Sequence, residues 1–330
     1  MSRWLVTGAL GFIGSHFARL VLKERPDVEI VNLDIVSYCG NPANLRDIEA
    51  LERYHFIKGD ITDPEVVRAA IGSGVDAIVN FAAETHVDRS LADAKPFHRT
   101  NVDGVGVLLE AARQREVPRF VQVSTDEVYG EAPDGTFFSE NDPLNPRNPY
   151  SESKATAEQL ALSYWSNHDV PVVITRGSNT YGSYQYPEKI VPLFVTNLID
   201  DLPVPLYGDG RQVRDWLHVL DHARGVLAVL ERGEPGNAYN LSGNNYRTNL
   251  ELTERLVNAC GRSTQTHVRH VKDRVNHDRR YAMNAAKAYA LGWEPLVEFE
   301  DGLRETVAWY RDNEAWWRPL KVVETEKRTA

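Results

Sequence analysis

The stretch WLVTGALGFIG, residues 4–14, decides the fold. Its first four residues predict a buried β-strand, and Gly8, Gly11 and Gly14 follow at once with the spacing GxxGxxG. The turn then opens a helix that we predict over residues 12–24. Glycines suit this position because the turn is tight and the backbone must approach a pyrophosphate at the helix N-terminus. The stretch predicts the first unit of a doubly wound parallel (Rossmann) sheet that binds a dinucleotide.

The rest of the first half continues the same alternation of β-branched runs and helical stretches, which is typical of βαβ units. It includes a long helix near 101–115 and a strand, RFVQVST, that ends at Thr125. After about residue 180 the pattern becomes irregular and rich in proline, glycine and aromatic residues. Helices are expected there over 187–200, 218–231, 248–260 and 301–312.

We therefore predict an α/β fold in two parts. Residues 1–178 form a Rossmann domain that binds the dinucleotide, and residues 216–232 return to it. Residues 179–215 and 233–320 form a smaller, irregular α/β domain for the substrate. Residues 321–330 are a tail.

Asp34 ends the second predicted strand, 20 residues after Gly14. A carboxylate at this position accepts hydrogen bonds from the adenosine ribose and repels a 2′-phosphate, so it favours NAD over NADP. The alternative is a glycine turn and a solvated aspartate by coincidence. Asp60 and FAAET (81–85) end the next two strands, where a cofactor would cross the sheet. Asp60 could equally cap the helix that begins near Pro64.

Tyr150 and Lys154 form a YxxxK pair in a predicted helix, on one helical face. A lysine ammonium near a phenol lowers the phenol's pKa, so the tyrosine can take a proton from a substrate hydroxyl. The alternative is a solvated Tyr/Lys face. Thr125 stands where a second hydroxyl partner is expected, and Asp126 and Glu127 follow it. Two buried carboxylates suit an acid and a base, although one could simply cap a turn or pair with an arginine.

Composition narrows the class of protein further. The chain has 330 residues, 42% of them hydrophobic, and a formal net charge of −10. This charge, without a Lys/Arg block, argues against nucleic acid as a partner. Cys39 and Cys260 are the only cysteines, which indicates a reducing compartment. We expect a cytoplasmic enzyme with no membrane segment and no metal.

These motifs together resemble the extended short-chain dehydrogenase/reductase family, which works on nucleotide sugars. The triplet Thr125-Asp126-Glu127 resembles the nucleoside-diphosphate-hexose 4,6-dehydratases, because epimerases and decarboxylases of the family usually carry a small or neutral residue there. Further sequence segments, spread along nearly the whole chain, are similar to those of the dTDP-glucose 4,6-dehydratases. They are AAETHVDRS (82–90), TNVDG (100–104), SNTYGSYQYPEKIVPL (178–193), PLYGDGRQVRDWLHV (205–219), TNLE (248–251), DRVNHDRRYAM (273–283) and WYRDNEAWW (309–317).

The resemblance implies a redox-neutral reaction with bound NAD that turns dTDP-glucose into dTDP-4-keto-6-deoxyglucose and water. Tyr150, with Thr125 and Lys154, serves oxidation at C4, Glu127 removes the C5 proton, and Asp126 protonates the leaving C6 hydroxyl. The alternatives are a 4,6-dehydratase or 4-epimerase of a GDP-, UDP- or CDP-linked sugar, and, remotely, a non-catalytic NAD-binding scaffold.

The resemblance also implies the contact residues and a homodimer built on the helices near 101–115 and 150–165. Those for NAD are Gly8, Gly11, Phe12, Ile13, Gly14, Asp34, Ser37, Asp60, Ile61, Phe81, Ala82, Ala83, Thr100, Tyr150 and Lys154. Those for the nucleotide sugar are Thr85, Thr125, Asn179, Lys189, Ile190, Pro205, Tyr207, Arg214, Asn249, Arg274 and His277. Tyr207 and Pro205 flank the base, and Thr85 reaches the hexose. Val275 and Asn276 replace the family's usual Pro-Gly, which leaves the path of that loop open.

Overall fold

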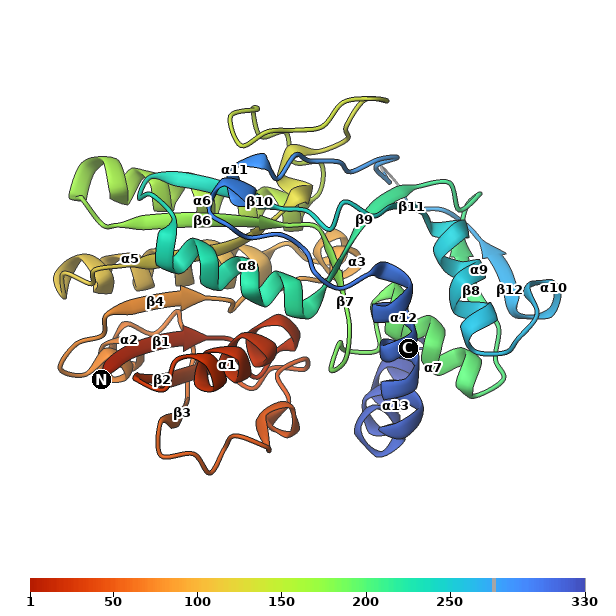
Figure 1. Cartoon of the computed structure of the whole chain (residues 1–330), viewed down its shortest axis with the longest axis horizontal. Helices are drawn as coiled ribbons and strands as arrows, with labels where there is room; N and C mark the ends of the chain where they lie inside the picture. Colours follow the sequence, from red (N-terminus) through yellow and green to blue (C-terminus); the bar gives the residue numbers. More distant parts are fainter. Residues whose placement is uncertain (275–276, 330) are drawn as a thin grey trace.

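A parallel sheet of seven strands forms the centre of the computed structural model, which describes residues 1–274 and 277–329 (Figure 1). The strand order is β10-β6-β5-β4-β1-β2-β3. The strands are β1 (Ser2–Thr7), β2 (Val28–Asp34), β3 (Tyr54–Lys58), β4 (Ala77–Asn80), β5 (Phe120–Thr125), β6 (Val172–Gly177) and β10 (Asn237–Leu241). The order reverses on either side of β1, so the predicted doubly wound sheet is confirmed and a crevice forms where the order changes.

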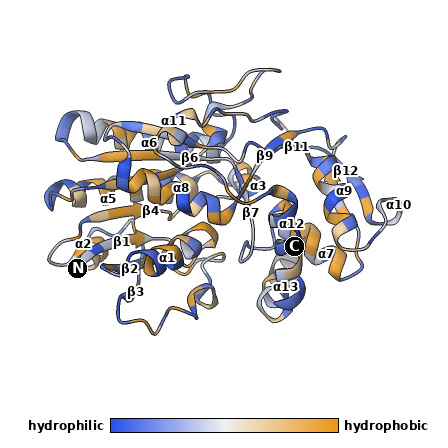
Figure 2. Ribbon diagram, viewed as in Figure 1, coloured by the Kyte–Doolittle hydropathy of each residue, from blue (hydrophilic) through white to orange (hydrophobic). Residues whose placement is uncertain are grey.

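Helices cover both faces of this sheet. One face carries α1 (Phe12–Glu24) and α8 (Val219–Arg232), which pack against each other. The other face carries α2 (Pro64–Ile71), α5 (Gly104–Gln114) and α6 (Pro149–His168). Because both faces are covered, the strands are apolar along most of their length, as the colouring of β1, β4 and β6 shows (Figure 2). Of the range 216–232 predicted to return to the Rossmann domain, residues 219–232 form α8, whereas 216–218 end β9 (Val213–His218) in a separate small sheet.

Strand β10 differs from the prediction, which placed 233–320 in the second domain. Asn237–Leu241 pairs in parallel with β6 and forms the edge of the central sheet. Helix α11 (Ala286–Ala290) packs beside it, and Ala288 and Trp293 enter the core under α8. The strand has only five residues, and its place in the sheet depends on α8 carrying the chain back across it. Short-range periodicity does not contain that information.

The remaining elements lie beyond the carboxyl ends of the strands. They include two small sheets of order β11-β9-β7 and β12-β8. The strands are β7 (Asn179–Tyr181), β8 (Val204–Tyr207), β9 (Val213–His218), β11 (Tyr246–Thr248) and β12 (Val268–Val271). The helices are α7 (Ile190–Ile199), α9 (Asn249–Ala259), α10 (Thr264–His267), α12 (Phe299–Asp312) and α13 (Glu314–Thr329). Their own core includes Phe194, Trp216 and Tyr310.

Short elements complete the chain around the crevice. They are the one-turn helices η1 (Pro42–Leu45), α4 (Lys95–His98) and η3 (Asp126–Tyr129), the helix α3 (Val87–Ala92), and the π-helical turn η2 (Arg99–Asp103) that leads into α5. Among the described residues, no helix is long and apolar enough to cross a membrane.

Candidate active site

One cavity lies at the carboxyl ends of the central strands, and every predicted site residue lines it. The cofactor set, the substrate set and the five residues assigned to catalysis all face this space, although they come from segments spread over residues 8–277. The arrangement follows from topology, because parallel strands present their carboxyl ends and following loops at one edge.

The glycine loop leaves no room for side chains. Gly8 has φ +70°, and a Cβ there would lie 2.6 Å from the backbone nitrogen of Ala82. A Cβ on Gly14 would lie 2.6 Å from the carbonyl oxygen of Gly8. The N-terminus of α1, capped by no side chain, points into the cavity beside them. This loop fits the pyrophosphate of a dinucleotide, which needs close backbone approach and helix N–H groups.

Asp34 is fixed at the end of β2. Its two carboxylate oxygens accept hydrogen bonds from the backbone N–H groups of Leu10 (3.0 Å) and Val36 (2.8 Å). Burial raises the pKa of this carboxyl, and the two N–H donors oppose that shift. A carboxylate held here at the cavity wall fits the ribose hydroxyls of NAD.

Asp60 does not cap α2. Its carboxylate accepts from the backbone N–H of Thr62 and pairs with Arg99, at 2.9 Å in each case. Asp63 is the cap, accepting from the N–H groups of Glu65 and Val66. The alternative role considered for Asp60 is therefore wrong, because the helix begins one turn later than that role requires.

Tyr150 and Lys154 lie in the first turns of α6, and both are buried. Lys154 Nζ donates to the carbonyl oxygen of Val123 at 2.5 Å, and burial lowers the pKa of this lysine to about 8. Burial, followed by the charge of Glu127, raises the pKa of Tyr150, while a hydrogen bond with Thr125 opposes the rise. Burial therefore dominates the pKa of Tyr150 in this structure, and the lowering of that pKa by Lys154 stays a prediction.

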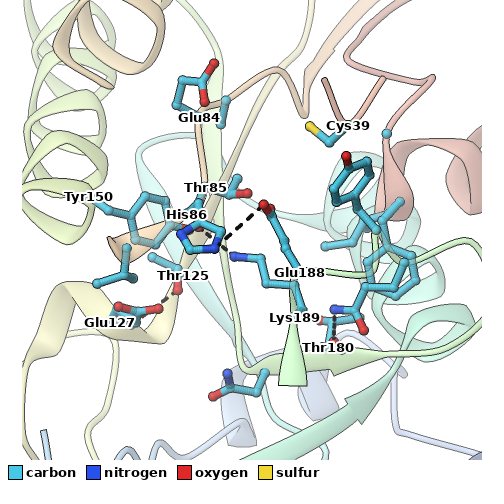
Figure 3. Close-up of a pocket in the computed structure, with 18 of the residues that line it drawn as sticks. Cys39, Glu84, Thr85, His86, Thr125, Glu127, Tyr150, Thr180, Glu188 and Lys189 are labelled. Atoms are coloured by element: carbon cyan, nitrogen blue, oxygen red, sulfur yellow. Dashed lines mark hydrogen bonds and ion pairs between the residues drawn. The ribbon is translucent and has the colours of Figure 1, made fainter. Parts of the chain in front are cut away.

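Asp126 and Glu127 begin the turn η3 directly after β5 (Figure 3 shows Glu127 beside Thr125). Asp126 is 4% exposed, and its Oδ2 has no hydrogen-bond partner among the described residues. Burial, then the charge of Glu127, raises the pKa of Asp126 well above its usual value. Burial also raises the pKa of Glu127, while a hydrogen bond from Asn148 Nδ2 to its Oε2 (3.3 Å) lowers it.

The structure excludes the simpler roles considered for these two carboxylates. The turn is capped by Thr125, whose side chain accepts from the N–H of Glu127. Neither carboxylate forms an ion pair with a residue in the described ranges 1–274 and 277–329. Two carboxyl groups with raised pKa values, aimed into a cavity beside a buried tyrosine, are suited to proton transfer.

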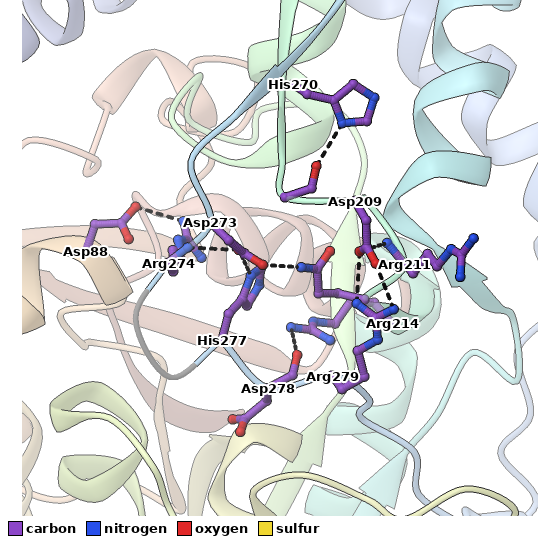
Figure 4. Close-up of polar contacts among 12 residues, drawn as sticks. Asp88, Asp209, Arg211, Arg214, His270, Asp273, Arg274, His277, Asp278 and Arg279 are labelled. Atoms are coloured by element: carbon purple, nitrogen blue, oxygen red, sulfur yellow. Dashed lines mark hydrogen bonds and ion pairs between the residues drawn. The ribbon is translucent and has the colours of Figure 1, made fainter.

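The other end of the cavity is rich in cations (Figure 4 shows Arg214, Arg274 and His277). Lys189 Nζ donates to the carbonyl oxygen of Thr85 at 2.7 Å. The Arg274 guanidinium pairs with Asp88 at 2.7 Å and lies 4.8 Å from the centre of the Tyr207 ring. These groups can neutralise a diphosphate, and the tyrosine offers a surface for a base.

Three further features belong to this end. His277 Nδ1 lies 2.6 Å from Asp273 Oδ1, which holds the imidazole ring in place. Arg214 donates to the carbonyl oxygen of Asp278 and lies over the Tyr281 ring. Asn179 Oδ1 is buried without a hydrogen-bond partner in the described part of the chain, as expected where a ligand supplies the donor. Val275 and Asn276, whose loop was left open, fall outside the described residues.

Sequence reasoning missed several residues of the cavity wall. Glu84, His86, Glu188 and Tyr281 belong to segments quoted above, and Asn148 directly precedes the predicted helix of Tyr150 and Lys154. Tyr38 donates to Glu188 at 3.0 Å, and Arg89 pairs with the same carboxylate at 3.1 Å. These contacts join the loop after β2 and the helix α3 to the segment before α7. Figure 3 shows the His86 ring joined to the Glu188 carboxylate, with Lys189 beside them. Only Asn148 carried a sequence signal, as a capping residue before Pro149.

Comparisons with known proteins agree with the geometry. The family model described as GDP-mannose 4,6 dehydratase matches residues 5–306. A dTDP-glucose 4,6-dehydratase of Streptomyces niveus is 49% identical over 324 residues, which cover 97% of this chain and 96% of that protein. A Streptomyces venezuelae dTDP-glucose 4,6-dehydratase solved with NAD is 48% identical, with a TM-score of 0.94 over 96% of this chain and 99% of that chain.

A further solved structure, the dTDP-glucose 4,6-dehydratase of Bacillus anthracis in complex with NAD, is 45% identical. Its TM-score is 0.91, over 97% of this chain and 100% of that chain. Similarity at this level extends through both parts of the molecule and both ends of the cavity. The chain therefore belongs to the dTDP-glucose 4,6-dehydratase family of the extended short-chain dehydrogenases/reductases.

Proposed function

We propose that this chain is an NAD-dependent hydro-lyase that converts dTDP-glucose into dTDP-4-keto-6-deoxyglucose and water. The observation that carries the proposal is the pair of neighbouring carboxyl groups, buried Asp126 and half-buried Glu127, beside Tyr150 in one cavity. A dehydrogenase or an epimerase needs the tyrosine, whereas elimination of water also needs an acid and a base. The glycine loop and Asp34 would hold NAD, which would supply an acceptor for the hydride from C4 and a donor of hydride to C6.

In the first step Tyr150 takes the proton of the C4 hydroxyl. Thr125 shares a hydrogen bond with Tyr150 and lies at the same end of the cavity, so it can hold that hydroxyl in place. The charge of Lys154, one turn along the helix, favours the phenolate form of the tyrosine. The product of this step is a 4-keto sugar, whose carbonyl acidifies the hydrogen at C5.

In the second step Glu127 removes the C5 proton and Asp126 protonates the departing C6 hydroxyl. The roles follow from the surroundings of each group. Asp126 has the more strongly raised pKa, so it holds a proton. Glu127 receives a hydrogen bond from Asn148 and lies near Lys189, Arg214 and Arg274, which favour its ionised form. Protonation at C5 then completes the product.

The substrate is held by the cation-rich end of the cavity. We assign Lys189, Arg214, Arg274 and His277 to the diphosphate, and Tyr207 with Pro205 to the base. Arg274 is paired with Asp88 across the cavity, so substrate binding would exchange this carboxylate for a phosphate. Asn179, Asn249 and Thr85 would complete the sugar and nucleoside contacts.

The test is a panel of dTDP-, GDP-, UDP- and CDP-hexoses incubated with the purified chain. Mass spectrometry should show loss of one water and a 4-keto-6-deoxy product from dTDP-glucose. Epimerised sugar without loss of water, or product only from another nucleotide sugar, would select one of the alternatives. If none of these sugars reacted, the remaining alternative would be a non-catalytic protein that binds NAD.

Tyr207→Ala should raise KM for dTDP-glucose with little change in kcat, because stacking on the base is equal in the ground and transition states.

We also propose that the chain forms a homodimer and acts in the cytoplasm. Within each chain, residues 179–215 and most of 233–320 would form the substrate domain. Supporting the dimer, α5 and α6 pack together and a groove runs along them, lined by Val102, Gly106, Val107, Ala111, Leu160 and Tyr164. Supporting the compartment, Cys39 and Cys260 are both unpaired.

A further inference from the structure

Asn148 contacts two catalytic elements with opposite ends of one amide. Its Oδ1 accepts from the backbone N–H of Ser151 at 2.9 Å and so caps α6, the helix of Tyr150 and Lys154. Its Nδ2 donates to Glu127 Oε2 at 3.3 Å, across 21 residues of chain. The cap therefore decides which end of the amide faces the carboxylate, because a flipped amide would point its NH2 group at the Ser151 N–H.

The backbone of Asn148 is fixed as firmly as its side chain. Ser151 Oγ lies 3.2 Å from the N–H of Asn148, and it donates to the carbonyl oxygen of the same residue at 3.0 Å. Ser151 is fully buried, and Pro149 stands at the first helical position. The donor that faces Glu127 is thus held by a capping box rather than by a mobile side chain.

We infer that Asn148 is a positioning residue for the second step. Asn148 orients the Glu127 carboxylate relative to Tyr150 and keeps that carboxylate ionised. This inference rests on the proposed function, since it assumes that Glu127 is the C5 base. Tyr150 lies two residues beyond the cap on the same helix, so one side chain fixes the distance between the base of the first step and the base of the second. Asn148 itself transfers no proton.

Other charged and titratable groups also face Glu127, and the test must separate Asn148 from them. Two of them are acids: Asp126 lies beside it on η3, and Tyr150 lies on α6. The cations come from other elements: Lys189 directly precedes α7, Arg214 lies on β9, and Arg274 follows β12. Tyr281 belongs to the same segment as Arg274. The three cations favour the ionised carboxylate, and Asp126 opposes it. None of these groups changes when Asn148 is replaced.

Two substitutions remove the donor but keep the cap. Serine and aspartate cap helices about as well as asparagine, so Asn148→Ser and Asn148→Asp should both fold. In Asn148→Ser the Glu127 carboxylate loses its N–H donor. In Asn148→Asp it also gains a neighbouring negative charge. The matched control is Asp63→Ser, which makes a similar exchange at the cap of α2, away from the cavity.

The experiment follows two signals with dTDP-glucose in deuterated water across a range of pH. Formation of reduced cofactor reports the first step, and uptake of deuterium at C5 reports the second. In both Asn148 variants we expect the first signal to stay within about twofold of wild type, and the second to fall on the order of 10- to 100-fold. The acid limb of the exchange profile should move to higher pH, further in Asn148→Asp, and Asp63→Ser should match wild type.

Three results would overturn the inference. One is an unchanged exchange rate and pH profile in both variants. Another is an equal fall of both signals, which would give Asn148 a role in the helix alone. The third is the same change in Asp63→Ser. A wild-type chain that forms no 4-keto-6-deoxy product would overturn the proposed function itself, and this result is distinct from the other three.

Discussion

At the scale of single residues, neighbouring carboxyl groups have different surroundings. Asp126 is 4% exposed and has one oxygen without a partner among the described residues. Glu127 receives an amide donor and faces three cations. Since burial penalises charge and donors or cations favour it, the first group retains its proton more strongly than the second. An acid and a base can therefore stand side by side on one turn.

Substitution of each carboxylate should separate the two steps. Asp126→Asn and Glu127→Gln should both still form reduced cofactor with dTDP-glucose, because Tyr150, Thr125 and Lys154 are intact. Product formation should fall by about 10² to 10⁴, the usual contribution of a general acid or base. Asp126→Asn should still exchange the C5 hydrogen with deuterated water, whereas Glu127→Gln should not. Stopped-flow absorbance and mass spectrometry of the recovered sugar measure both effects.

Tyr150→Phe serves as the control for this pair and should block the formation of reduced cofactor as well. If Glu127→Gln exchanged the C5 hydrogen at the wild-type rate, the base would have to be another group.

The pH dependence of kcat should be bell-shaped, with both limbs due to this pair. Glu127 works when ionised, so activity falls as pH decreases through its raised pKa. Asp126 works when protonated, so activity falls as pH increases through its more strongly raised pKa. Because the two carboxyl groups are neighbours and interact, the two limbs report on the pair rather than on either residue alone. In Asp126→Asn the alkaline limb should disappear from the residual rate, and an unchanged alkaline limb would assign it to a different group.

At the scale of elements, the buried side chain of Arg176 joins the two elements that carry the catalytic groups. From β6 it pairs with Glu158 on α6, with a shortest distance of 2.7 Å, and donates to the hydroxyl of Tyr129 on η3 at 2.6 Å. The Tyr129 hydroxyl in turn donates to Asn240 on β10 at 2.7 Å. The helix of Tyr150 and the turn of Asp126 are therefore both fixed to β6, and the turn is also fixed to β10.

Breaking this pair should destabilise the fold strongly. Glu158→Gln leaves the Arg176 charge buried without its counter-charge, so we expect the free energy of unfolding to fall by about 3 kcal/mol or more. Glu65→Gln, which breaks the exposed pair with Arg68 on α2, should cost less than about 1 kcal/mol. Denaturant unfolding of the variants and wild type measures both. Equal losses would show that the buried pair has no special importance.

At the scale of the whole molecule, α5 and α6 form a pair of neighbouring helices with an apolar groove between them and α2. Gly106 of α5 and Leu160 of α6 both line the groove and lie near each other. A second copy of the chain would cover this surface and bury its half-buried side chains. The catalytic helix α6 would then be held from both sides.

Leu160→Glu should therefore convert the proposed dimer into a monomer, because it places a charge in the centre of the covered groove. Sedimentation velocity at several concentrations measures the change. Leu296→Glu makes the same exchange at a side chain that is 64% exposed and outside the groove, and it should remain dimeric. A wild-type chain that sediments as an active monomer would refute the dimer.

Local spacing in the sequence determined the dinucleotide loop, the acidic end of β2 and the YxxxK helix. Each of these features lies within one strand, turn or helix, where backbone geometry alone fixes which side chains share a face. Gly8 shows this well, since its φ of +70° follows from a tight turn between a strand and a helix, whereas its close approach to Ala82 depends on the pairing of β1 with β4. The positions of Thr125, Asp126 and Glu127 at a strand end were predictable for the same reason.

Only the tertiary structure decided what depends on distant partners. Strand β10 joins the central sheet because β6 offers it an edge, and Arg274 meets Asp88 across 186 residues. Burial of Tyr150, which raises its pKa, and the contact of Asn148 with Glu127 arise where α6 packs against β5 and η3. Periodicity acts over a few residues, whereas desolvation and long-range pairing depend on the whole sheet order. The sequence therefore predicted which groups are present and that the two carboxyl groups serve as an acid and a base, but not which distant side chains they contact.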